Sequence, residues 1–141
     1  MPLYKRQIFS GFSSTHYPNG ICIPGIRKVF VDIKGNFYIC EKTDNFQTIG
    51  NVNQGFDYAK INKIINDYIK LSEKKCSKCW AVRLCRVCFV SAIHGKYLSI
   101  NKKNIACENF KRKLLYSLMV YTKILEKKKN ALDYMQNIWV G

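Results

Sequence analysis

Four of the seven cysteines lie within a thirteen-residue stretch that reads CSKCWAVRLCRVC. They are Cys76, Cys79, Cys85 and Cys88, so five residues separate two CxxC pairs. Thiolates are the soft ligands that bind zinc and iron–sulfur clusters, and thiols this dense exceed what ordinary core packing needs. In tight CxxC turns the backbone amides can also point at the sulfur atoms and stabilise their charge. The stretch therefore predicts metal binding.

The spacing of the cysteines bears on which metal group they bind. The two CxxC pairs could form one tetrahedral zinc site, but their gap is short for a zinc ribbon or finger, where about 12–20 residues usually intervene. Such a site would also leave Cys22, Cys40 and Cys107 without a role. A [4Fe–4S] cluster takes four thiolates, or three when one iron keeps a position for another ligand, so seven cysteines suffice for one cluster of each kind. His94 could also ligate a metal, but the cysteines already suffice.

The cysteine count and the N-terminal sequence indicate the compartment. Seven is an odd number, whereas a secreted disulfide scaffold favours an even number and a signal peptide. Residues 1–20 lack an apolar core and a small-residue cleavage site, and no run approaches the ~18 apolar residues of a membrane span. We therefore expect the reducing cytoplasm, where clustered thiols indicate metal ligands, and no membrane partner.

The net charge of +15 is compatible with binding to a polyanion such as nucleic acid. The basic residues are dispersed along the chain, however, and Lys, Asn and Ile are abundant throughout, as in AT-rich coding sequence. Cations near thiolate-ligated clusters also offset their negative charge. The dispersal of the basic residues therefore disfavours nucleic acid as a partner, despite the high net charge.

A hairpin and two helices are expected to position the cysteines. Residues 27–40 alternate in the period of a strand, turn at a glycine and return, which predicts a β-hairpin that brings Cys22 toward Cys40. Asp57 is a candidate N-cap for a helix over 58–71. Residues 108–140 predict a long basic amphipathic helix, which could bind a membrane or nucleic acid but equally could pack against its own domain.

The complete cysteine pattern resembles that of a known family. It runs Cys22–x12–Gly35–x4–Cys40, then Cys76–x2–Cys79–x5–Cys85–x2–Cys88, then Cys107. This pattern resembles the seven-cysteine SPASM domain, the auxiliary-cluster module of many radical SAM peptide-modifying enzymes. The flanking text, CIPGIRKVFVDIKGNFYICEKTD with IGNV after it, is most similar to maturases of Cys-rich ribosomal peptides. The resemblance covers residues 18–125, although the last CxxC pair has two intervening residues where the family usually has three.

The resemblance implies how the cysteines are shared between two [4Fe–4S] clusters. One cluster would be bound by Cys76, Cys79, Cys85 and Cys107. The other would be bound by Cys22, Cys40 and Cys88. In the family, the open iron of such a three-cysteine cluster is a candidate site for a substrate thiolate. The adjacent Glu41 could occupy that position instead.

The resemblance also implies a role within a larger enzyme. A radical SAM core carries a CxxxCxxC motif, which this sequence lacks, so we expect no S-adenosylmethionine site and no self-sufficient enzyme. The clusters would serve electron transfer or substrate docking for a radical SAM core on another chain or on a missing N-terminal domain. A Cys-rich precursor peptide would be the further partner. The chain looks like a split, truncated or trimmed auxiliary module.

The expected fold class is α+β, with a small hairpin, irregular cysteine-rich loops, a middle helix and a long C-terminal helix. We expect an N-terminal arm or linker remnant at 1–17, a SPASM-like iron–sulfur domain at 18–110 and a basic amphipathic helix packed on it at 111–141. Two alternatives stay open. One is a non-enzymatic protein that binds a Cys-rich peptide beside a separate radical SAM chain, and the other is a structural zinc or nucleic-acid-binding protein.

Overall fold

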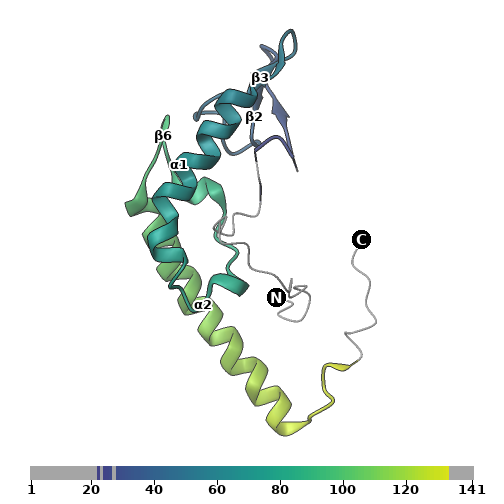
Figure 1. Cartoon of the computed structure of the whole chain (residues 1–141). Coiled ribbons are helices and arrows are strands. Elements are labelled where there is room, and N and C mark those ends of the chain that lie inside the picture. The colour runs from purple at the N-terminus through teal and green to yellow at the C-terminus, as the bar shows by residue number, and fades with distance from the viewer. Residues whose placement is uncertain (1–21, 23, 27, 134–141) are drawn as a thin grey trace.

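The computed structural model describes Cys22, residues 24–26 and residues 28–133. These residues form an α+β structure with a small antiparallel sheet and two α-helices, which confirms the expected fold class. Figure 1 shows the sheet at one end of the molecule and the second half of the long helix extending away at the other. The arm expected at 1–17 lies outside the described residues.

The sheet contains four short strands in sequence order, β1 (Phe30–Val31), β2 (Asn36–Tyr38), β3 (Gly50–Asn51) and β4 (Gly55–Phe56). Every neighbouring pair is antiparallel. β1 and β2 form the predicted hairpin, although its strands are shorter than the alternating sequence suggested. The pairing of β3 with β4 adds a second hairpin that the sequence did not predict.

The turn between β1 and β2 is organised by the side chain of Asp32. Its carboxylate accepts hydrogen bonds of 2.8 Å from the backbone N–H groups of both Lys34 and Asn36. These bonds, with that of the Asn36 side chain as the largest contribution, hold the pKa of Asp32 below its ordinary value. Gly35 completes the turn with a φ of +78°, a conformation that side chains with a Cβ rarely adopt.

Helix α1 (Tyr58–Cys76) begins at the predicted N-cap. The carboxylate of Asp57 accepts a hydrogen bond of 3.0 Å from the backbone N–H of Lys60. The helix continues past the expected end at residue 71, so that its last residue is a cysteine. Its buried side includes Ile61, Ile64, Tyr68 and Ser72.

The cysteine-rich segment after α1 is mostly irregular. It contains two 3₁₀ helices, η2 (Val82–Leu84) and η3 (Phe89–Ala92). A two-stranded hairpin follows, formed by β5 (Ile93–His94) and β6 (Tyr97–Leu98). This hairpin leads into the N-terminus of the long helix (Figure 1).

Aromatic side chains connect these elements in the core. The ring of Phe89 lies 4.9 Å from that of Tyr68 and 5.9 Å from that of Phe46, measured between centroids. Phe89 belongs to η3, Tyr68 belongs to α1, and Phe46 lies in the loop between the two sheet hairpins. The buried cluster consists of Ile39, Phe46, Ile49, Ile61, Ile64, Tyr68, Phe89 and Ala92. The core therefore joins the sheet side of the molecule to the cysteine-rich segment.

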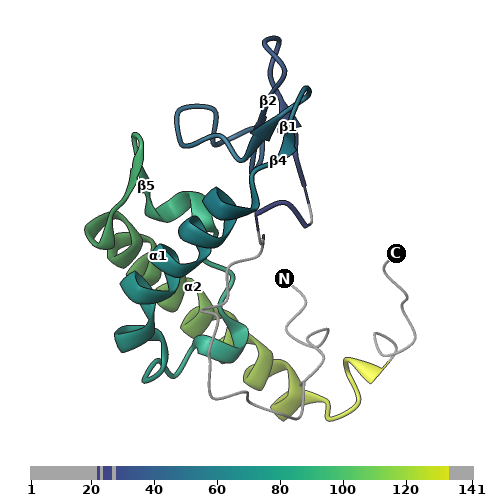
Figure 2. The ribbon, with the colours of Figure 1, turned by 45° about the horizontal axis from the view of Figure 1, so that its top comes forward.

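Helix α2 spans Ile100–Lys127, so the predicted bounds of 108–140 are wrong at both ends. It begins earlier because the hydroxyl of Ser99 caps it by accepting a hydrogen bond from the backbone N–H of Lys102. Residues 128–133 are not α-helical, and the rest of the expected helix lies outside the described residues. Both views place the beginning of α2 beside α1 (Figure 1 and Figure 2).

The apolar side chains of α2 are only partly covered by the rest of the described chain. Leu114 is fully buried. Several others are exposed, namely Leu115, Tyr116, Met119, Val120 and Ile124. No helix in the described part of the chain is long and apolar enough to span a membrane.

Candidate metal centre

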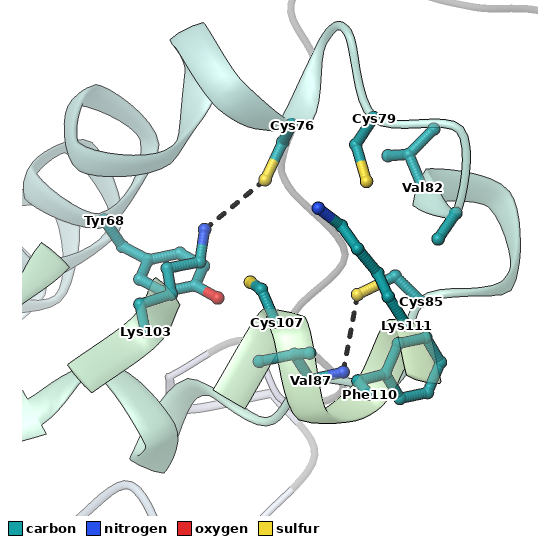
Figure 3. Close-up of a pocket in the computed structure, with 11 residues that line it drawn as sticks. Tyr68, Cys76, Cys79, Val82, Cys85, Val87, Lys103, Cys107, Phe110 and Lys111 are labelled. Atoms are coloured by element: carbon teal, nitrogen blue, oxygen red, sulfur yellow. Dashed lines mark hydrogen bonds between the residues drawn. The ribbon is translucent and has the colours of Figure 1, made fainter. Parts of the chain in front are cut away.

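Four cysteines from separate elements line one pocket between α1, the irregular segment and α2. Cys76 is the last residue of α1, and Cys79 lies in the turn that follows. Cys85 ends η2, and Cys107 lies inside α2. Figure 3 shows their sulfur atoms arranged around a common space. This grouping coincides with one of the two ligand sets that the family resemblance implied.

Successive tight turns present the first three of these cysteines. The backbone N–H of Cys79 donates to the carbonyl of Cys76 at 3.2 Å, and that of Val82 donates to the carbonyl of Cys79 at 3.0 Å. The backbone N–H of Val87 donates to the sulfur of Cys85 at 3.5 Å. One backbone amide therefore points at a site sulfur, as expected for a turn that stabilises thiolate charge.

The remaining walls of the pocket are largely apolar. They include Ala81, Val82, Val87 and Phe110, and the cavity measures about 30 Å³. This volume exceeds the ~10–15 Å³ that one ordered water requires. An apolar shell limits access of water and strengthens electrostatic interactions at the sulfur atoms.

A buried lysine lies at the Cys76 side of the pocket. The side chain of Lys103 is 4% exposed, and its ammonium donates to the sulfur of Cys76 at 3.4 Å. The same ammonium contacts the hydroxyl of Ser72 and lies 4.8 Å from the centroid of the Tyr68 ring. Lys103 is thus held by three residues of α1, the last of which is a cysteine of the site (Figure 3).

Cys107 lies between two lysines on one face of α2. Lys103 and Lys111 are four residues before and after it, a spacing that places all three side chains on the same side of a helix. Burial raises the pKa of the Cys107 thiol, while the charges of the two lysines act in the opposite direction.

Lys111 differs from Lys103 in having a carboxylate partner. Its ammonium donates to the carboxylate of Glu108 at 2.9 Å. This hydrogen bond is the main reason why the pKa of Lys111 is raised, and the charges of Cys79 and Cys107 contribute in the same direction. The pocket therefore has one lysine with an acidic partner and one held by a sulfur, a hydroxyl and an aromatic ring.

Neither lysine was predicted from the sequence as part of the site, because the apolar periodicity put the expected start of α2 after Cys107. Once the helix is extended to Ile100, the pattern of Lys103, Cys107 and Lys111 has the period of one helical face. Ser99 is a recognisable N-cap residue, so the sequence contained a signal for the earlier start.

The other three cysteines do not line this pocket. Cys40 is buried, while Cys22 and Cys88 are partly exposed. Cys40 follows β2 in a turn where its carbonyl accepts from the hydroxyl of Thr43 at 2.8 Å. The shared site of Cys22, Cys40 and Cys88 stays a prediction.

Glu41, the expected alternative ligand beside Cys40, has a different partner in the structure. Its carboxylate forms an ion pair of 3.3 Å with Lys28, and both side chains are largely exposed. A hydrogen bond from the backbone N–H of Glu41 to its own carboxylate, together with the Lys28 ammonium, holds the pKa of Glu41 below its ordinary value. His94 does not line the pocket either, and it stacks on Tyr97 with ring centroids 5.2 Å apart.

The chemistry of the four-cysteine pocket fits a thiolate-ligated iron–sulfur cluster. Each thiolate of such a cluster binds a different iron, so its ligands must surround a space. The four sulfurs do so, and N–H groups from Val87 and Lys103 point at two of them. In the described part of the chain, no three His, Cys, Asp or Glu side chains are placed to hold a single metal ion.

Comparisons with known proteins add no family assignment. The chain matches no protein-family model, no curated protein and no solved structure.

Proposed function

We propose that this chain binds iron–sulfur clusters, with one [4Fe–4S] cluster ligated by Cys76, Cys79, Cys85 and Cys107. The observation that carries the proposal is the convergence of these four cysteines, from two helices and the segment between them, on one apolar-walled pocket. Thiolates are the ligands of such clusters, and hydrogen bonds to their sulfur atoms tune them. When bound, the cluster would supply one-electron redox chemistry.

The residues of the chain have separable roles in this proposal. The four cysteines provide the thiolates, and the turns after α1 hold three of them in place. Val87 and Lys103 donate hydrogen bonds to sulfur. The apolar walls restrict water. Cluster binding releases the thiol protons, which favours binding at neutral and higher pH.

The wider proposal follows the family resemblance. A second [4Fe–4S] cluster would be bound by Cys22, Cys40 and Cys88, with one iron open to a substrate thiolate. The chain would act as the auxiliary domain of a radical SAM peptide maturase that modifies a Cys-rich precursor peptide. The radical SAM core would belong to another chain or to a further domain. This role is compatible with a cytoplasmic location.

Anaerobic reconstitution with iron and sulfide tests the first part. We expect charge-transfer absorption near the visible region, an EPR signal after reduction with dithionite, and about eight irons per chain if both clusters form. A second sample is reconstituted with zinc. A chain that takes up about one zinc in this second sample, but acquires neither iron–sulfur absorption nor an EPR signal in the sample with iron and sulfide, would refute the proposal.

Matched cysteine variants test the ligand set. The triple variant Cys22→Ser, Cys40→Ser, Cys88→Ser retains the whole pocket, so it should bind about four irons per chain. The single variant Cys107→Ser should lose the pocket cluster and keep the other. Loss of both clusters in either variant would contradict the partition.

A zinc site is the second candidate, since four cysteines can also ligate zinc. The same four residues would then be the ligands, but they would have to move closer together, since among the described residues no three are placed to hold a single metal ion. The iron and sulfide sample above distinguishes the two, because a chain that forms only a zinc site would acquire neither the absorption nor the EPR signal of an iron–sulfur cluster in it.

A further inference from the structure

The buried ammonium of Lys103 requires an electrostatic explanation. Burying a charged group is costly unless another group compensates for it. Among the described residues, the ion pairs of the structure do not include Lys103. Its contacts are the hydroxyl of Ser72, the ring of Tyr68 and the sulfur of Cys76. Of these contacts, only the sulfur acquires a full negative charge, when the thiol becomes a thiolate ligand.

We propose that Lys103 is the buried counter-charge of the pocket and sets the reduction potential of the group that the four cysteines bind. This inference rests on the proposed iron–sulfur function and adds a positioning and tuning residue to it. Lys103 donates to the sulfur of Cys76 and does not ligate the metal.

The direction of the effect follows from charge. Four thiolates give an oxidised [4Fe–4S] centre a net negative charge, and one-electron reduction makes that charge more negative without forming or breaking a bond. A nearby cation stabilises the reduced cluster, which is more negative, more strongly than the oxidised cluster. Burial of the cation increases this difference in stabilisation, because the local dielectric constant is low. Lys103 therefore raises the reduction potential.

Lys111 provides an internal comparison. Its charge is partly offset by Glu108 at 2.9 Å, and its side chain is more exposed than that of Lys103. Both features weaken its influence on the sulfur atoms. We therefore expect Lys103 to have the larger effect of the two.

The test uses the reconstituted full chain and a redox titration with dithionite, followed by EPR. Lys103→Met removes the charge while retaining an unbranched side chain, and Lys103→Gln removes the charge while retaining an N–H donor. Lys102→Met is the matched control, because Lys102 is an exposed neighbour on the same helix. Far-UV circular dichroism and the iron and sulfide content are measured for every variant.

We expect Lys103→Met to shift the reduction equilibrium at least tenfold toward the oxidised state, which lowers the potential by about 59 mV for one electron. Lys103→Gln should give a smaller shift in the same direction. Lys102→Met should change the equilibrium by less than about twofold, because exposed charges are screened. If Lys103→Met fails to fold, Lys103→Gln decides the question. Loss of the cluster from a folded Lys103→Gln chain, with Lys102→Met fully loaded, would also support the counter-charge role.

Two results would overturn the inference, and they differ. A fully loaded Lys103 variant whose potential equals that of Lys102→Met would refute the role of Lys103 and leave the proposed function intact. An unsubstituted chain that binds no iron–sulfur cluster would refute the proposed function and the inference together.

Discussion

Replacing Phe89 with alanine should cause a large loss of stability. The side chain is 1% exposed and contacts the rings of Tyr68 and Phe46. Removing a buried phenylalanine ring typically costs about 3–5 kcal/mol in the free energy of unfolding, through lost burial and the cavity that remains. Domains of this kind have total stabilities of about 5–15 kcal/mol, so Phe89→Ala should remove a substantial fraction.

Urea unfolding followed by circular dichroism measures this cost. The protein is kept with a reductant and a chelator, so that bound metal and disulfides do not contribute. Tyr116→Ala is the matched control because Tyr116 is 70% exposed, and it should change the free energy of unfolding by less than about 0.5 kcal/mol. A double-mutant cycle with Phe46→Leu and Phe89→Leu should give a coupling of about 0.5–1.5 kcal/mol. A cost below about 1 kcal/mol for Phe89→Ala would refute the packing described for this core.

Three further predictions concern local structure. Gly35→Ala should lower the free energy of unfolding by about 1–2 kcal/mol, because φ is +78° and the added Cβ would lie 2.6 Å from a Cγ of Val52. In urea unfolding, adding Val52→Ala to this variant should recover the part of the loss that comes from the steric clash, but not the part that comes from the positive φ. Ser99→Ala should lower the free energy of unfolding by only about 0.5 kcal/mol, because the capping hydrogen bond from the N–H of Lys102 is long at 3.4 Å. An unchanged midpoint of urea unfolding would contradict the capping role of Ser99. Hydrogen bonds in the first turn, chiefly that from the Asn36 side chain, lower the pKa of Asp32 below 3.8. The ionised carboxylate of Asp32 therefore stabilises the fold fully above that pH, and this stabilisation is lost as the pH falls through the lowered pKa. Asp32→Asn should make the urea midpoint less dependent on pH between 5 and 2, and an identical dependence would argue against the hydrogen-bonded turn.

The sequence predicted those parts of the fold that local signals determine. The first hairpin was recognisable from alternation and a glycine turn, and Asp57 marked the start of α1 because capping depends on neighbouring residues. β4 was missed because it is two residues long and begins with a glycine, so it shows no alternation. The predicted end of α2 was wrong because the apolar periodicity of the sequence continues beyond Lys127, where the helix ends.

The grouping of four cysteines could be anticipated from the sequence and the family resemblance, but the residues around them could not. Cysteine spacing led to the prediction of metal binding, and the family resemblance grouped Cys107 with three earlier cysteines that the structure places in the same pocket. The buried position of Lys103 could not be inferred, because it depends on the packing of α2 against α1. In a chain with 24 basic residues, one lysine gives no sign that it is buried.

The positions of Cys76 and Cys107 have a consequence for the entropy of the unfolded chain. They are 31 positions apart, at the end of one helix and inside the other, so a group ligated by both would close a loop of that length. Such a crosslink restricts the denatured chain as a disulfide does, and a loop of this size corresponds to roughly 3–4 kcal/mol of lost chain entropy. In a reducing compartment, where disulfides do not persist, metal ligation would be a means of covalently constraining a small core.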